Sequence, residues 1–278
     1  MLPSVSTWSA HEALLNGTLS MEDFLDRIKD NGARGIEIVD FDLLDASLPA
    51  LEQIKREVGC RGMTITCMSL EHNLCLPTQE ERDGDVARVM RWMEAAKRLD
   101  VRNVRVFTGW ALSWMPYPIQ MEWVYQGLCK LANHAETLDV DLVLENHNSV
   151  CLGSGEILDM FKRVGSSRLF TCPDVFNYKT FAGENIPVID DWSFSEVKPL
   201  LRLARNAHIK VCEAVQNDTE DRYLDVGRMV RMLREAEYDG SLALEFMWPY
   251  LPAGRDPIVE MLKAVRVVAH HCERSRRF

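Results

Sequence analysis

Short apolar runs alternate with longer stretches of helical period along the whole chain. Eight such runs occur, at residues 5–8, 35–39, 63–67, 103–107, 141–145, 168–172, 207–211 and 241–245. Dividing 278 residues by eight gives about 35 residues per unit, which is the length of a strand, a helix and two loops. This alternation predicts repeated βα units built around a parallel sheet.

Eight such units are the number that closes into a (β/α)₈ TIM barrel, for which roughly 250 residues are typical. The alternative is an open doubly wound sheet, but the chain has neither a G-x-G-x-x-G turn nor a Walker-type glycine–lysine loop. No Pro/Gly/Ser-rich linker divides it, so we expect one α/β barrel domain over residues 1–278. The longest irregular stretches, 109–118 and 181–192, both follow predicted strands.

Helix start signals stand between the apolar runs. Thr78 followed by Glu81 has the spacing of a capping box, and Asp256-Pro257 combines an N-cap residue with a proline in the first turn. These signals predict one helix after the third run and another after the eighth.

The formal net charge is -10, from 42 acidic and 32 basic residues, so the average surface repels nucleic acid and anionic lipid. We therefore expect neither as a partner, although a homo-oligomer remains compatible with the composition. The sequence has no apolar run of roughly 18 residues and no signal-peptide pattern, and its eight cysteines include no C-x-x-C pair. A cytoplasmic protein with free thiols is the expectation.

Four ionisable residues follow or lie within the last four predicted strands. Glu145 and Glu245 close their runs, Asp174 follows the sixth run, and His208 lies in the seventh. The separations are 174 − 145 = 29, 208 − 174 = 34 and 245 − 208 = 37 residues, each about one βα unit. Because the C-terminal ends of barrel strands meet at one face, these side chains are expected at a single mouth.

Three carboxylates in one mouth repel each other unless a cation or protons neutralise them, and the histidine adds a nitrogen ligand. We therefore expect one divalent metal ion there. Oxygen ligands with one imidazole favour Mn²⁺ or Mg²⁺, with Co²⁺ or Zn²⁺ also compatible. A single acid at a strand end is more often a cap or turn residue, but four suitable residues in consecutive units favour a site.

At these positions the sequence resembles the sugar isomerase/epimerase superfamily of xylose-isomerase-like barrels, which includes ketose 3-epimerases, hydroxypyruvate isomerase, inosose dehydratase and, more distantly, endonuclease IV. The resemblance spans essentially the whole chain. Its carriers are Gly35-Ile-Glu-Ile, Val104-Arg-Val-Phe, Leu144-Glu-Asn-His, Cys172-Pro-Asp-Val-Phe-Asn, His208-Ile-Lys and Leu244-Glu-Phe. It implies a barrel with metal ligands at Glu145, Asp174, His208 and Glu245, and with Glu145 and Glu245 as the paired acid–base carboxylates.

The resemblance also implies that Lys210 and His147 face the substrate. The alternatives are a lysine paired with a neighbouring carboxylate and a histidine that orients Glu145. Many sugar epimerases and endonuclease IV have a histidine three residues after the aspartate, where this chain has Asn177, so the substrate contact at that corner differs.

Further candidates for substrate binding follow other strands. His72 either lines the pocket or lies in a loop, and Trp110 and Trp248 either wall a sugar ring or pack a lid. Glu37 is a candidate on the second run, with an internal ion pair, for example to Arg105, as the alternative.

Such a site favours proton transfer on a ketose or related hydroxyketone through a metal-stabilised enediolate, giving epimerisation or isomerisation. If the enediolate expels a β-hydroxyl, the same site is a dehydratase of the inosose or dehydroshikimate type. A nuclease would need several metals and more histidines, and the charge opposes DNA. A non-catalytic binding or subunit role is the remaining alternative, because fold alone does not establish function. No phosphate clamp is evident, which favours an unphosphorylated carbohydrate-like molecule.

Overall fold

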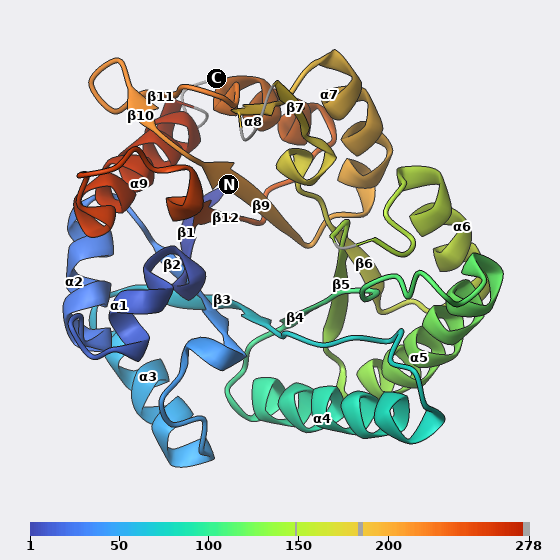
Figure 1. Cartoon of the computed structure of the whole chain (residues 1–278). Helices are drawn as coiled ribbons and strands as arrows, with labels where there is room; N and C mark the ends of the chain where they lie inside the picture. Colours follow the sequence, from blue (N-terminus) through green and yellow to red (C-terminus); the bar gives the residue numbers. More distant parts are fainter. Residues whose placement is uncertain (148, 183–185, 275–278) are drawn as a thin grey trace.

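Eight parallel strands form a nearly closed barrel in the computed structural model, which describes residues 1–147, 149–182 and 186–274 (Figure 1). Their order around the barrel is β6-β5-β4-β3-β2-β1-β12-β9. The strands are β1 (Leu2–Ser6), β2 (Gly35–Val39), β3 (Thr64–Ser69), β4 (Asn103–Val106), β5 (Asp141–Glu145), β6 (Leu169–Cys172), β9 (Asn206–Val211) and β12 (Ser241–Phe246). The predicted (β/α)₈ TIM barrel is confirmed.

The barrel closes through a short seam between β6 and β9. A parallel bridge joins Thr171 to Ala204, and the Arg205 N–H donates to the Thr171 carbonyl oxygen at 3.1 Å. The His208 N–H donates to the Pro173 carbonyl oxygen at 3.1 Å. These few hydrogen bonds take the place of a full ladder between the two strands.

Helices surround the barrel, as Figure 1 shows. The α-helices are α1 (His11–Leu15), α2 (Met21–Asp30), α3 (Leu48–Cys60), α4 (Gln79–Arg98), α5 (Tyr117–Leu138), α6 (Ser154–Val164), α7 (Asp191–Val197), α8 (Val226–Glu235) and α9 (Pro257–Arg274). Shorter 3₁₀ helices are η1 (Thr7–Ala10), η2 (Asp40–Asp42), η3 (Val175–Tyr178), η4 (Lys198–Leu203) and η5 (Trp248–Tyr250). Among the described residues, no helix has both the length and the apolar character needed to cross a lipid bilayer.

Some predicted boundaries differ from the structure. The first strand covers Leu2–Ser6 instead of 5–8, because Leu2 to Val5 pair with β12 and Trp8 already belongs to η1. The stretch 181–192, expected to be irregular, includes residues of a two-stranded antiparallel sheet of β7 (Thr180–Ala182) and β8 (Ile186–Val188). A second such sheet pairs β10 (Ala214–Val215) with β11 (Glu220–Asp221).

Burial of both faces explains why the strands read as nearly continuous apolar runs. In β9 and β12 every residue is buried, with Ala207, Ile209 and Val211 alternating with polar residues. The apolar members belong to the core beneath the helices. The alternation of a strand therefore sends the other set, which is polar, into the barrel.

The capping box at the start of α4 gives a test of the helix signals. The Glu81 N–H donates to Thr78 Oγ1 at 3.2 Å, and the Thr78 N–H donates to Glu81 Oε2 at 2.9 Å. Thr78→Ala removes one acceptor and should lower the free energy of unfolding in urea by about 1 kcal/mol. Thr78→Ser keeps the hydroxyl and should stay close to the wild type. Equal unfolding midpoints for all three proteins would contradict this assignment.

Candidate metal centre

Strand register brings the polar face of β9 next to that of β12. His208 lies opposite Ala243 and Lys210 lies opposite Glu245 in the parallel ladder. Because side chains two residues apart share a face, His208 and Lys210 point to the same side of the sheet, the barrel interior. The mouth thus receives an imidazole, an ammonium and a carboxylate from two neighbouring strands.

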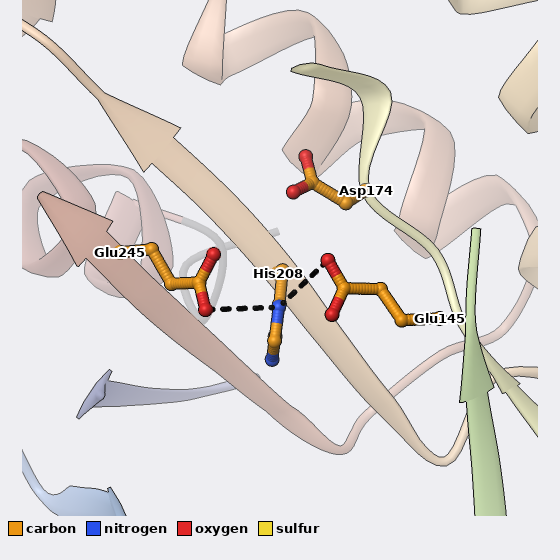
Figure 2. A group of neighbouring side chains, drawn as sticks. All are labelled: Glu145, Asp174, His208 and Glu245. Carbon is orange, nitrogen blue, oxygen red and sulfur yellow. Dashed lines mark ion pairs between the residues drawn. The ribbon is translucent and has the colours of Figure 1, made fainter. Parts of the chain in front are cut away.

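Four buried side chains meet at this mouth: Glu145 at the end of β5, Asp174 after β6, His208 on β9 and Glu245 on β12 (Figure 2). Each offers one ligand atom, and these atoms lie within 4.8 Å of one another. The sequence expectation that the four converge at one mouth matches this geometry. Such a buried cluster of carboxylate oxygens and one imidazole nitrogen can hold a metal ion.

The imidazole of His208 contacts Glu37, a fully buried residue of β2. Its Nε2 lies 3.0 Å from Glu37 Oε2, and Asn206 Nδ2 donates to the same oxygen at 2.7 Å. When the ring is neutral and Nε2–H donates to Glu37, the lone pair of Nδ1 faces the other carboxylates. Metal-binding histidines commonly have this arrangement, in which a carboxylate fixes the tautomer.

The Nδ1 atom of His208 supports the fit to a cation. It forms ion pairs with Glu145 Oε1, 3.4 Å away, and with Glu245 Oε1, 3.6 Å away; dashed lines mark these pairs in Figure 2. This atom is buried and has no hydrogen-bond partner among the described residues. Two carboxylates around this atom require positive charge between them, which either a proton on the imidazole or a cation bound by Nδ1 supplies. The residues present therefore fit a divalent cation.

Lys210 supplies positive charge to the same cluster. Its Nζ donates to Asp174 Oδ2, lies 2.8 Å from Glu245 Oε2 and 3.4 Å from Glu145 Oε1, and donates to Asn177 Oδ1 at 3.1 Å. Asn177 Nδ2 in turn donates to Glu145 Oε1 at 2.8 Å. The carboxylate pairing considered for Lys210 is thus present, and Asn177 also belongs to the cluster.

The charge around Glu145 keeps this carboxyl group ionised. Burial alone would raise the pKa of Glu145, but His208 and Lys210 lower it well below its usual value. Arg105 adds a third cationic neighbour, with its Nε 3.4 Å from Glu145 Oε2. Glu145 is therefore available as a ligand or as a base.

A small hollow of about 150 Å³ opens beside this cluster, and we call it the inner hollow. Its walls are largely apolar, and five of its residues are polar or charged. The lining residues are Trp8, Val39, Phe41, Glu71, Arg105, Phe107, His147, Lys210, Glu245 and Met247. Several of these were not candidates from the sequence. The sequence did mark Arg105 as an interior candidate, because a charged residue in the middle of a strand that is apolar throughout points into the barrel.

The remaining aromatic candidates lie at different depths. His147 lines the inner hollow, and its ring stacks on Phe107 with centroids 4.6 Å apart. Trp110 meets His147 edge-on at 6.1 Å but is 52% exposed and does not line the inner hollow. Trp248 packs near Trp8, with centroids 6.0 Å apart.

Two candidates lie behind the walls of the inner hollow. His72 is buried, and its Nε2 accepts a hydrogen bond from the Phe107 N–H at 2.7 Å, so it supports the wall that Phe107 forms. Glu37 lies beneath His208 and does not line the inner hollow. The internal ion pair considered for Glu37 is present, but its partner is His208, whereas Arg105 pairs with Glu145.

The sequence model of the xylose isomerase-like TIM barrel family matches residues 25–267. The chain belongs to this family. None of the curated proteins compared with the sequence matches it significantly.

Several solved structures share the fold of the chain. L-ribulose 3-epimerase is 17% identical with a TM-score of 0.74, covering 100% of this chain and 96% of that one. D-psicose 3-epimerase from Clostridium cellulolyticum H10 is 17% identical with a TM-score of 0.70, covering 99% and 98%. The probable 3-DHS dehydratase AsbF from Bacillus anthracis is 15% identical with a TM-score of 0.68, covering 100% of both chains. At these identities the likeness shows the barrel fold.

The buried His72 makes a pH-dependent contribution to stability. Burial, with Arg105 and Arg88 nearby, lowers the pKa of His72 to about 3. An unfolded histidine takes up a proton near pH 6.5, so this contribution is present above that value and is lost as the pH falls towards about 3. Between about pH 7.5 and about pH 5.5 the loss from this group is about 1.4 kcal/mol.

Between about pH 7.5 and about pH 5.5, the free energy of unfolding of His72→Gln in urea should therefore fall by about 1.4 kcal/mol less than that of the wild type. His134→Gln, on α5, controls for the removal of a histidine elsewhere. The same pH dependence in His72→Gln and in the wild type would show that His72 is not held neutral.

Proposed function

We propose that this barrel is a divalent-metal-dependent isomerase or epimerase. It would move a proton at the carbon next to the carbonyl group of an unphosphorylated ketose or related hydroxyketone. The observation that carries the proposal is the position of Glu145 and Glu245 on either side of His208 (Figure 2). Two buried carboxylates that face each other beside a small hollow are suited to removing and returning a proton.

Glu145, Asp174, His208 and Glu245 would hold the cation, and their oxygen-rich set with one imidazole suits Mn²⁺ or Mg²⁺, with Co²⁺ or Zn²⁺ as alternatives. When bound, the ion would polarise the carbonyl group and stabilise the negative charge that develops on proton removal. The three carboxylates and the histidine lie on or just after four different strands, so the barrel itself sets their spacing.

Proton transfer would be divided between the two glutamates. Glu145, kept ionised by its neighbours, would take the proton, and Glu245 would deliver one from the opposite side, which inverts the carbon. Return of the proton to the neighbouring carbon would instead exchange ketose and aldose. His147 and Arg105 line the same hollow and would bind substrate hydroxyl groups.

The apolar walls would exclude water from the reacting carbon. Trp8, Phe41, Phe107 and Met247 line the inner hollow and leave little room for solvent within about 150 Å³. Exclusion of water strengthens the electrostatic interactions inside the site and protects a reactive intermediate from side reactions.

One observation favours a dehydratase as the second candidate. Lys210 Nζ lies 2.8 Å from Glu245 Oε2 and lines the hollow, so a proton donor stands beside the carboxylate. Loss of a β-hydroxyl group needs such a donor, because the leaving oxygen must take up a proton. AsbF, which shares the fold, is named a probable dehydratase.

Metal content is the first test of this proposal. Purified protein should contain or take up about one manganese, magnesium, cobalt or zinc ion per chain by mass spectrometry, and Glu245→Gln and His208→Ala should weaken the binding. Glu37→Gln should lower metal affinity by roughly 10-fold to 100-fold, since the carboxylate that orients the imidazole is lost. Glu213→Gln, a buried glutamate that pairs with Arg222, is the matched control. Failure to take up any metal would end the proposal.

Exchange of the α-proton in heavy water tests the reaction itself. Metal-loaded protein incubated with ketoses such as D-fructose and D-tagatose should incorporate deuterium next to the carbonyl group. Glu145→Gln and Glu245→Gln should each lower kcat by roughly 100-fold to 10,000-fold, with Glu213→Gln again as control. An unsaturated ketone among the products would select the dehydratase. Metal binding without exchange on any ketose or keto-polyol would point to a binding role.

A further inference from the structure

A second and larger hollow lies beside the inner one on the same face of the barrel. It measures about 600 Å³ and is formed by residues 9–13, 16 and 18, after β1, and by Trp248 with residues 254–258, after β12. We call it the outer hollow. Because β1 and β12 are paired strands, the segments after them are neighbours, and α1 and α9 lie on one side of the barrel in Figure 1.

The indole ring of Trp8 stands between the two hollows. Trp8 lines the inner hollow, and its ring centroid lies 5.0 Å from that of His11 and 6.0 Å from that of Trp248, both of which line the outer hollow. The two hollows are therefore neighbours, and a ligand that bridges Trp8 would occupy both.

The sizes of the hollows suggest such an extended ligand. Small-molecule sites commonly measure roughly 300–1,000 Å³. The inner hollow, at about 150 Å³, falls below this range, whereas the outer hollow, at about 600 Å³, falls within it. The inner hollow suits only the small reacting part of a molecule.

The lining of the outer hollow suits a neutral polyhydroxy group. His11, Glu12 and Asn16 offer hydrogen-bonding groups next to the indole of Trp248. The cation of the lining, Arg255, is already compensated, since it lies 3.2 Å from Glu260 and 3.7 Å from Glu213. An anionic phosphate would lack a free cation here, while sugar hydroxyl groups and the apolar face of a sugar ring find matching partners.

His11 is held in a fixed orientation towards the outer hollow. Its Nδ1 donates to Asp42 Oδ1 at 2.5 Å, and Asp42 Oδ2 accepts from Thr7 Oγ1 at 2.6 Å. The side chain of Asp42 is 0% exposed and that of His11 is 20% exposed, so the accessible edge of the ring is the one away from Asp42. That edge carries Nε2, an acceptor for a hydroxyl group.

Trp248 contributes its indole ring to the wall of the outer hollow. Its Nε1 is shielded from solvent, so the ring and not its N–H is what a ligand meets. The wall of the outer hollow thus combines an oriented acceptor with an aromatic ring.

We propose that the substrate is a ketose joined to a second sugar ring. The ketose unit occupies the inner hollow, and the second ring occupies the outer hollow against Trp248 and His11. This inference rests on the proposed function for the identity of the reacting unit. It adds no chemical step, because the second ring contributes binding energy and leaves the reacting carbon unchanged.

Calorimetric titration of the protein with Mn²⁺ present tests this inference without requiring turnover. The probes are fructose and three ketose disaccharides, isomaltulose, maltulose and lactulose. At least one disaccharide should bind with a Kd at least about tenfold lower than that of fructose. Ala13→Trp, which fills the outer hollow from α1, should remove this gain. Leu15→Trp places the same ring on the same helix at an exposed position outside the hollow, and should keep it.

Equal or weaker binding of all three disaccharides relative to fructose would overturn the inference. So would a gain that persists in Ala13→Trp, because the second ring would then lie elsewhere. If Ala13→Trp does not fold by circular dichroism, Thr18→Trp, on the same wall, replaces it. Disaccharide binding that depends on the outer hollow, without deuterium exchange, would support the binding site and reject the proposed reaction.

Discussion

The rest of the site depends on how buried negative charge is balanced inside the barrel. Glu37, Glu145, Asp174 and Glu245 are all nearly inaccessible to water, and burying an uncompensated carboxylate costs several kcal/mol. Lys210 compensates part of this charge directly, and Arg105 approaches Glu145 from β4. The imidazole of His208 lies between these groups, with a carboxylate on either side. Every proposed role at the mouth follows from this concentration of charge.

A polar network continues from the mouth into the barrel. Asn206 donates to Glu37 and accepts a hydrogen bond from Ser241 Oγ at 2.6 Å, while the Tyr238 hydroxyl donates to the Ser241 carbonyl oxygen. Each member fixes the orientation of the next, and a half-satisfied buried network would be costly. The position of the His208 ring is therefore set by residues from three strands, β2, β9 and β12, and not by its own strand alone.

The sequence was sufficient for the features that depend on local periodicity. The order of strands and helices, the capping box of α4 and the convergence of Glu145, Asp174, His208 and Glu245 all follow from spacing along the chain. The sequence did not predict the features that depend on distances across the barrel. The pairing of Arg105 with Glu145, where Glu37 had been the alternative, requires knowledge of which interior side chains lie at the same height.

Loop geometry was the other limit. Trp8, Phe41 and Met247 form walls of the inner hollow from segments after β1, β2 and β12, and no short-range pattern marks an aromatic or methionine residue there as a wall. Trp8 even belonged to the expected first strand. Its inclusion was wrong because an apolar residue at a strand end reads the same whether the chain stays extended or turns into a 3₁₀ helix.

Two of the four clustered residues, Asp174 and His208, lie next to the seam between β6 and β9. Asp174 lies two residues after the end of β6 and His208 lies on β9, so they stand on opposite sides of the place where strand pairing is least continuous. A cation bound by both residues would link β6 to β9, the two strands at the ends of the sheet order. The free energy of cation binding would then also stabilise the closed barrel. The barrel with the cation bound would therefore be more rigid than the barrel without it.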